Sequence, residues 1–211
     1  TQALGVKVVS VFPNNPKLGL PSVIGTILLN DSKTGEPLAI LDGTFLTAMR
    51  TGAASGVATK YLAKKTAETV GIFGTGVQAR TQLMGMCEVR KIVRAKAYSV
   101  DPPDVRQAFC KEMADKLLIE VMEAKTPREV VKGSDIIVTA TTSAQPIFDG
   151  NWLEKGQHIN GIGSHSPDKR ELDEVAIRRS KVVVDSREAA LKEAGDLITP
   201  CLLYTSDAAD E

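Results

Sequence analysis

The chain has 211 residues, with 26 basic and 26 acidic side chains, a length that suits one large domain or one complete domain plus part of another. Its balanced charge excludes a general field for nucleic acid or an anionic membrane, and no apolar run approaches the ~20 residues that span a bilayer. Its three widely spaced cysteines, Cys87, Cys110 and Cys201, predict reduced thiols in a soluble, cytoplasmic protein without a zinc or other metal site.

The first 66 residues predict part of a small mixed α+β domain. Runs rich in β-branched residues predict three strands, at 6–12, 23–29 and 37–41. The turn-forming DSKTGE between the last two indicates a β-hairpin. A helix from Leu46 to Leu62, which carries Arg50, is predicted because apolar residues fall at helical spacing: Leu46, Met49, Ala53, Val57 and Tyr61.

Residues 67–200 alternate short apolar runs with amphipathic helices, which is typical of a doubly wound parallel sheet of the Rossmann kind. The predicted strands are 70–74, 95–100, 135–141, 158–163 and 181–186, with helices from about Val77 and around Val105 to Leu117. Residues 201–211, CLLYTSDAADE, follow no period, and we expect them to be a tail foreign to the domain.

The stretch VGIFGTGVQAR places small residues in a GxGxxA pattern between a strand and a helix. Gly74 permits a tight turn, Gly76 lets the backbone approach a pyrophosphate, and Ala79 permits close helix packing. The helix N-terminus offers N–H groups to phosphates. This context favours dinucleotide binding, and the alternative is a glycine-rich structural turn.

The next strand ends in YSVDPPD, where Ser99 and Asp101 lie about 25 residues beyond Gly74. An acidic side chain there would bind the ribose hydroxyls of NAD and repel the 2′-phosphate of NADP. Asp101 could equally form a turn or cap a helix, because prolines follow it. The sequence therefore leans towards NAD.

Five segments in this order resemble the ornithine cyclodeaminase and mu-crystallin family: GVKVVSVFPNNPKLGLPSV, LDGTFLTAMRTGAASGVATKYLA, VGIFGTGVQAR, HINGIGSHSPDKRELDE and VVVDSREAALKEAGDL. The resemblance covers residues 5 to about 200. It implies a Rossmann domain that binds NAD or NADP and a first domain that mediates homodimers. It also leads us to expect that the chain, which begins at Thr1, lacks N-terminal and C-terminal segments of the family.

The same resemblance implies the substrate and cofactor positions. Lys7 and Arg50 match the family's lysine and arginine that bind the substrate carboxylate; the alternatives are a solvated strand residue and a helix residue paired to an acid. The cofactor positions that it implies, some of which could be merely structural, are Ser22, Gly74, Gly76, Val77, Gln78, Ala79, Thr141, Ile162, Gly163 and Lys169.

His165 follows the strand HINGIG and therefore emerges at the ligand side of a parallel sheet. The family's cyclodeaminases and archaeal alanine dehydrogenases carry a catalytic aspartate at the matching position, and mu-crystallin-like members carry a serine. A histidine can exchange a proton with an imine or amine nitrogen near neutral pH. The alternative is a loop histidine bonded to its serine neighbours. His158, at the start of the strand, is expected to be structural.

These features predict an NAD(P)-dependent enzyme that transfers hydride to or from a small α-amino or cyclic α-imino acid. One branch is ornithine cyclodeamination, which His165 in place of aspartate weakens; the other is net redox, as in a ketimine reductase or alanine dehydrogenase. A mu-crystallin-like protein that binds NADPH and a small ligand with little turnover is an alternative. A Rossmann scaffold without a substrate site is another.

Overall fold

The computed structural model describes residues 3–12 and 14–200. The chain forms two compact units, residues 1–51 and 52–211, which are described in turn. The division falls inside helix α1 (Thr44–Leu62), because the second half of this helix packs on elements of the second unit. The domain boundary at residue 66 stays a prediction for the complete protein.

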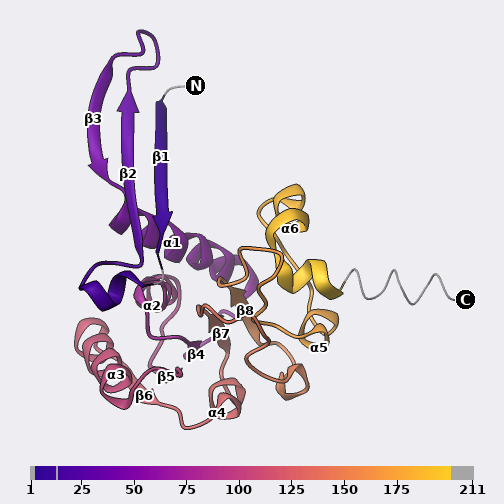
Figure 1. Ribbon diagram of the computed structural model, residues 1–211. Helices are drawn as coiled ribbons and strands as arrows, with labels where there is room; N and C mark the ends of the chain where they lie inside the picture. The colour runs from indigo at the N-terminus through magenta and orange to yellow at the C-terminus, as the bar shows by residue number, and fades with distance from the viewer. Residues whose placement is uncertain (1–2, 13, 201–211) are drawn as a thin grey trace, which may run out of the picture. The chain divides into compact units, whose positions relative to one another are not determined.

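The first unit contains an antiparallel sheet of order β1-β2-β3, drawn in indigo and violet in Figure 1. Its strands are β1 (Leu4–Val11), β2 (Val23–Asn30) and β3 (Pro37–Asp42), with a short 3₁₀ helix η1 (Asn15–Leu18) between the first two. In the turn after β2, the Asp31 carboxylate accepts two backbone N–H groups at 2.8 Å. The predicted strands and hairpin are confirmed.

The second unit is built on a five-stranded parallel sheet of order β6-β5-β4-β7-β8 (Figure 1). The strands are β4 (Thr69–Phe73), β5 (Arg94–Tyr98), β6 (Glu120–Glu123), β7 (Ile136–Thr139) and β8 (His158–Gly161). From β4 the chain adds strands first on one side and then, with β7, on the other. That reversal creates the crevice in which doubly wound folds bind ligands.

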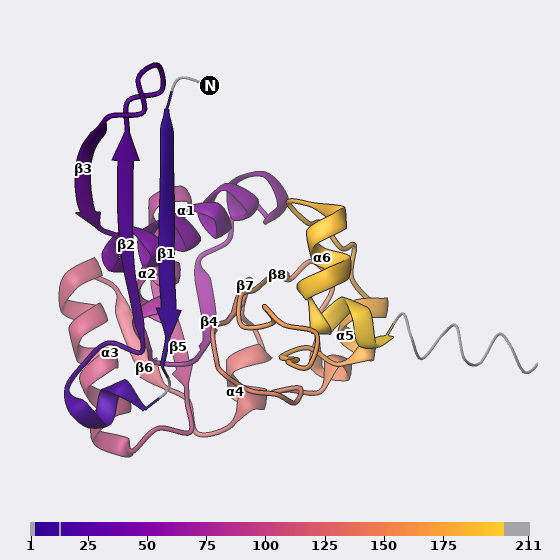
Figure 2. The same ribbon diagram turned by 45° about the horizontal axis from the view of Figure 1, so that its top comes forward.

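Helices cover both faces of this sheet, and the elements can be followed in Figure 2. Val70 and Ile72 of β4 share one core with Leu83 and Met86 of α2 (Val77–Val89) and with Phe109 and Met113 of α3 (Pro103–Leu117). Phe73 and Ile137 point to the opposite face, since strand residues alternate, and pack with α4 (Pro127–Val131) and α5 (Glu174–Arg178). A 3₁₀ helix η2 (Gly150–Trp152) and helix α6 (Arg187–Glu193) complete the unit. The predicted Rossmann-like fold is confirmed.

The part of α1 in the second unit packs against α2 through glycine. A Cβ on Gly52 would collide with the backbone of Thr81, and one on Gly85 would collide with the backbone of Gly52. The helix predicted here is confirmed. The apolar residues that predicted it lie on its exposed side, however: Val57 and Tyr61 are 58% and 75% exposed. Small residues let the two backbones approach closely, so the buried side of α1 is not its most apolar one.

The prediction of a strand at 181–186 is wrong for the described residues. The segment has no strand conformation, and Val182, Val183 and Val184 are exposed. The short, charged β6 was not predicted. A β-branched run needs a partner that completes its hydrogen bonds, and local propensity cannot say whether one is present. No described helix is long and apolar enough to cross a membrane.

Candidate functional site

The loops that follow β4, β5, β7 and β8 lie at one edge of the parallel sheet, because all these strands run in the same direction. All the predicted site residues of the second unit stand in these loops or directly after them: Gly74, Gly76, Val77, Gln78, Ala79, Ser99, Asp101, Thr141, Ile162, Gly163, His165 and Lys169. The fold therefore brings these residues to the carboxyl edge, where ligands of such sheets bind.

The glycine loop after β4 has the shape that a pyrophosphate requires. Gly74 has φ +102°, and a Cβ there would collide with the carbonyl oxygen of Ala140, so the chain itself demands glycine. At Gly76 a Cβ would meet nothing within 4 Å, which leaves room for another molecule. Gly76 is the N-cap of α2 and provides no side-chain cap, whereas Thr126, Asp173 and Ser186 cap α4, α5 and α6.

The residues of this loop fit a dinucleotide on further grounds. Ala79 is fully buried against the sheet, as close helix packing requires. The Gln78 Oε1 is buried and accepts no hydrogen bond in the described part of the chain, but it needs a donor, which phosphate oxygens do not supply. Uncapped N–H groups at a helix start attract an anion. A phosphate lying over Gly76 would supply the missing acceptor for them.

The carboxylate of Asp101 joins the loops after β4 and β5. It accepts hydrogen bonds from the hydroxyl groups of Thr75 and Ser99, the latter at 2.5 Å. Asp101 does not cap α3, whose N-cap is Pro102 without a side-chain bond. The cap alternative considered from the sequence therefore does not apply. An acidic group stands at the end of β5, half-buried beside the glycine loop.

Glu171 joins the loops after β7 and β8, and sequence reasoning missed it. Its side chain is fully buried. One carboxylate oxygen accepts from the backbone N–H and the hydroxyl of Thr141, both at 2.6 Å, and the other accepts from the backbone N–H of Gly163 at 2.6 Å. No ion pair involves Glu171 among the described residues. Only the folded loops reveal this role, because the sequence pattern presents Glu171 as one charge in a charged run.

His165 lies in the loop after β8 and is exposed. Its Nδ1 lies 2.8 Å from the carbonyl oxygen of Gly163. Because a carbonyl only accepts, Nδ1 carries the proton, and in the neutral ring Nε2 keeps its lone pair. The alternative of a histidine bonded to its serine neighbours does not describe this ring.

The two serines beside His165 have other partners. The Ser164 hydroxyl donates to the carbonyl of Lys169 at 2.8 Å and accepts from the backbone N–H of Asp196 at 2.9 Å. The Ser166 hydroxyl forms a hydrogen bond with the Asp168 carboxyl group. This bond is the main reason why the pKa of Asp168 is lowered. Each serine therefore shapes the loop around His165.

Asp196 is a second buried acid next to this loop. One of its oxygens accepts from the backbone N–H groups of Glu171 and Leu172, at 2.7 and 2.9 Å. Burial raises the pKa of the Asp196 carboxyl, and the nearby charge of Glu171 raises it further. Asp196 thus anchors the backbone that carries Glu171.

In the first unit, Lys7 and Arg50 come to the same stretch of α1. The Lys7 Nζ donates to the Thr47 hydroxyl at 3.3 Å, and Arg50 lies three residues further along the same helix. Residues three apart are neighbours on a helix surface, so both cations gather there. Both side chains are exposed. Ser22, just before β2, accepts from the backbone N–H of Phe12 through its carbonyl.

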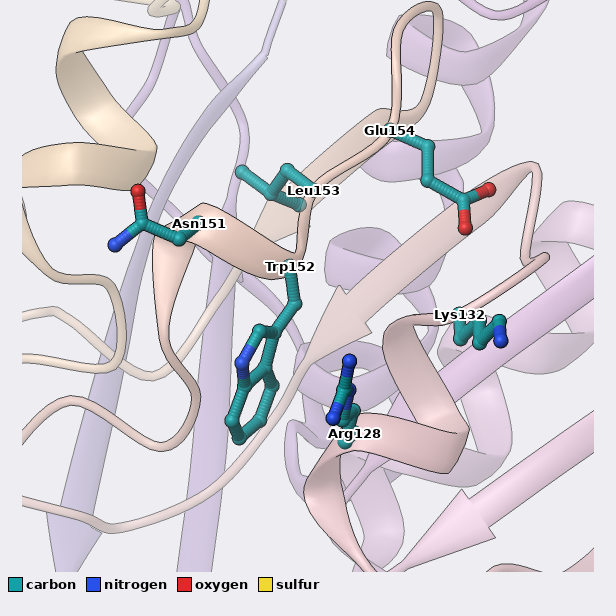
Figure 3. Close-up of a pocket in the computed structure, with 6 residues that line it drawn as sticks. All are labelled: Arg128, Lys132, Asn151, Trp152, Leu153 and Glu154. Carbon is teal, nitrogen blue, oxygen red and sulfur yellow. The ribbon is translucent and has the colours of Figure 1, made fainter.

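A cavity of about 250 Å³ lies elsewhere, beside α4 and η2 (Figure 3). Its lining residues are Arg128, Lys132, Asn151, Trp152, Leu153 and Glu154. These residues precede β7 and β8, so the cavity lies towards the amino ends of the strands and contains none of the predicted site residues. In residues 3–12 and 14–200, no group of three or more potential ligand side chains is arranged for a metal ion.

The glycine loop at the switch point of a doubly wound sheet defines a protein of the Rossmann type. A family model described as the ornithine cyclodeaminase/mu-crystallin family matches residues 1–208. The chain belongs to this family. The match includes residues 201–208, which the sequence pattern assigned to a foreign tail and which lie outside the described residues.

Two relatives named Δ1-pyrroline-2-carboxylate reductase stand out. The Bacillus cereus protein is 44% identical over 200 residues, which are 94% of this chain and 61% of the relative. The Thermococcus litoralis structure, in complex with NADH and L-proline, is 53% identical, with a TM-score of 0.92 over 96% of this chain and 62% of that one. An archaeal alanine dehydrogenase dimer with bound NAD is 36% identical, with a TM-score of 0.88 over 97% of this chain and 62% of that one. The chain spans about three fifths of the length of these proteins.

Proposed function

We propose that the complete protein is an NAD(P)-dependent reductase of a cyclic α-imino acid of the Δ1-pyrroline-2-carboxylate type. The observation that carries this proposal is the 53% identity to a reductase of that name solved with NADH and L-proline. The glycine loop, with its open space at Gly76 and its uncapped helix, supports the cofactor. The acid at the end of β5 supports NAD rather than NADP.

When bound, the reduced nicotinamide would supply hydride to the imine carbon. The imidazolium form of His165, protonated at both ring nitrogens, would give its Nε2 proton to the imine nitrogen and become the neutral Nδ1–H tautomer, so that the product is the cyclic amino acid. The Gly163 carbonyl supports this role, because it holds the ring through Nδ1 and leaves Nε2 for the substrate. A histidine can take up the next proton from solvent near neutral pH.

Lys7 and Arg50 would bind the carboxylate of the imino acid. Two cations from different elements, β1 and α1, can fix both position and orientation of that group. The bond from Lys7 to Thr47 supports this pairing, because it holds the ammonium one turn from Arg50. This bond places the Lys7 ammonium beside the turn of α1 that leads to Arg50, as the proposal requires.

The test uses the complete gene product with cyclic ketimines, ornithine, lysine and alanine, each with both coenzymes. We expect a steady loss of the reduced nicotinamide absorbance with Δ1-pyrroline-2-carboxylate and an equal amount of proline formed. Proline from ornithine without net coenzyme change would instead establish a cyclodeaminase. Binding of coenzyme and imino acid without product would establish a binding protein.

We further propose that the complete protein is a cytoplasmic homodimer. The first unit exposes apolar side chains, among them Val8, Ile40 and Phe45 at 63%, 76% and 69%, and a second copy would cover such a surface. The related alanine dehydrogenase is a dimer. Cys87 and Cys110 are free thiols, as a reducing compartment maintains. Light scattering should give twice the monomer mass, and cell fractionation should recover the protein in the cytoplasm.

A further inference from the structure

Glu171 is a buried charge that the proposed chemistry does not use. Burying a carboxylate without an ion pair costs free energy unless hydrogen bonds compensate for the lost water. Here three donors compensate, and they come from Thr141 and Gly163, which lie two residues beyond the ends of β7 and β8. An apolar side chain could fill this volume, but it could not fix both loops at once.

The bonds continue from Glu171 to His165 through a single residue. Gly163 donates its N–H to Glu171, and its carbonyl oxygen holds Nδ1 of His165. A Cβ on Gly163 would collide with the Glu171 carboxyl group and with the carbonyl of Thr141. The backbone of Gly163 is therefore packed directly against the carboxylate, which also accepts its N–H.

From this geometry we infer that Glu171 is the positioning residue for His165. It fixes Gly163, and Gly163 fixes the tautomer and direction of the imidazole. The inference rests on the proposed function, in which His165 acts as the proton donor. The carboxylate itself touches neither substrate nor cofactor in this scheme.

Glu171→Gln tests the inference, because the amide keeps an acceptor for Thr141 but turns an N–H towards the N–H of Gly163. Asp173→Asn is the matched control. Asp173 also accepts two backbone N–H groups, from Gly150 at 2.8 Å and Ala176 at 2.7 Å, and neither partner belongs to the loop that carries His165. Both variants are made in the complete protein, and folding is checked by circular dichroism.

The first measurement is heteronuclear NMR of the histidine rings, with His165 assigned from a His165→Ala variant. This readout needs neither substrate nor cofactor. We expect His165 to hold its proton on Nδ1 in the wild-type protein and in Asp173→Asn. Glu171→Gln should give a mixture of tautomers. An unchanged His165 signal in Glu171→Gln would overturn the inference even if the enzyme is active.

The second measurement is a double-mutant cycle on kcat. Glu171→Gln should lower kcat about 10- to 100-fold, with KM within about threefold, because a small misplacement of a proton donor is costly. In the His165→Ala background the same change should lower kcat less than about twofold. If Glu171→Gln lowers kcat by the same factor with and without His165, the two residues act independently and the inference is overturned. Loss of turnover in every variant, wild type included, would count against the proposed function alone, and the NMR result would still decide the role of Glu171.

Glu171→Asp serves if the glutamine variant does not fold. The shorter carboxylate can reach Thr141 or Gly163 but not both. A mixed tautomer with an intermediate loss of kcat would support the inference. A wild-type tautomer with wild-type kcat would overturn it.

Discussion

At the scale of single residues, the carboxylate at the end of β5 is the group that we propose selects NAD over NADP. Asp101 is held by the hydroxyl groups of Thr75 and Ser99 rather than by a cation. Its negative charge is therefore not cancelled by an ion pair among the described residues. A coenzyme with a phosphate on the adenosine ribose would bring a second negative charge close to it.

Asp101→Ser should reduce the preference for NADH. We expect the ratio of kcat/KM for NADH to that for NADPH to fall about tenfold, which corresponds to about 1.4 kcal/mol. Steady-state kinetics with both coenzymes give the ratio. Asp104→Asn, an exposed acid in the first turn of α3, is the control and should leave the ratio unchanged. A wild-type ratio in Asp101→Ser would exclude this role.

Arg50→Ala should weaken binding of the imino acid. We expect KM to rise roughly 10- to 100-fold, because a charge-assisted hydrogen bond to the carboxylate is lost. Arg94→Ala is the control. Arg94 is an exposed arginine of β5 that pairs with Glu120 at 2.7 Å. If both variants have the wild-type KM, Arg50 does not bind the substrate carboxylate.

At the scale of elements, Arg90 secures the end of α1 against α2 within the second unit. Its guanidinium donates to the carbonyl groups of Thr59, Lys60, Ala63 and Lys64, at 2.8 to 3.0 Å. The last carbonyls of a helix have no partner within the helix, and a cation there also meets the negative end of the helix dipole. One side chain thus completes a helix terminus.

Arg90→Ala should lower the free energy of unfolding by about 2–3 kcal/mol, because several of these carbonyls lose their donor. Denaturant unfolding measures the change. Arg94→Ala, which breaks only an exposed ion pair, should cost less than about 1 kcal/mol. Equal losses in the two variants would contradict the capping role.

Elements whose pattern is local were predictable, and those that depend on a distant partner were not. The glycine loop and the strands around it follow from β-branched runs and small residues at fixed spacing. The run 181–186 has the same composition but no strand conformation, and β6 forms although half of its residues are charged. Glu171 was missed for the same reason, since its donors lie 30 residues before it and 8 residues before it.

At the scale of the whole molecule, a half-buried histidine is expected to contribute to the response to acid. His158 begins β8, and its ring donates to the side chain of Asn160 at 3.2 Å. Burial lowers the pKa of His158 from the usual value of 6.5, and the charge of Arg90 lowers it further, against the effect of Asn160. The folded protein therefore binds this proton less readily than the unfolded chain does.

Acid should destabilise the fold through His158. Below about pH 6.5 the unfolded chain binds the proton and the folded chain does not, so the free energy of unfolding falls as the pH falls towards the lowered folded pKa. His158→Gln, which can still donate to Asn160, should flatten this slope between pH 6.5 and that value. Denaturant midpoints across the range measure it. The same slope in both proteins would show that another group is responsible.

The two glycines of the nucleotide loop separate folding from binding. Gly74 is demanded by the chain's own backbone, whereas Gly76 borders space that no described atom fills. In a survey of variants scored by protein abundance, substitutions of Gly74 should therefore lower abundance, and substitutions of Gly76 should leave it unchanged. In the same survey scored by coenzyme binding, substitutions at both positions should be deleterious. Gly76→Ala, which adds one methyl group, should therefore give a folded protein that does not bind coenzyme.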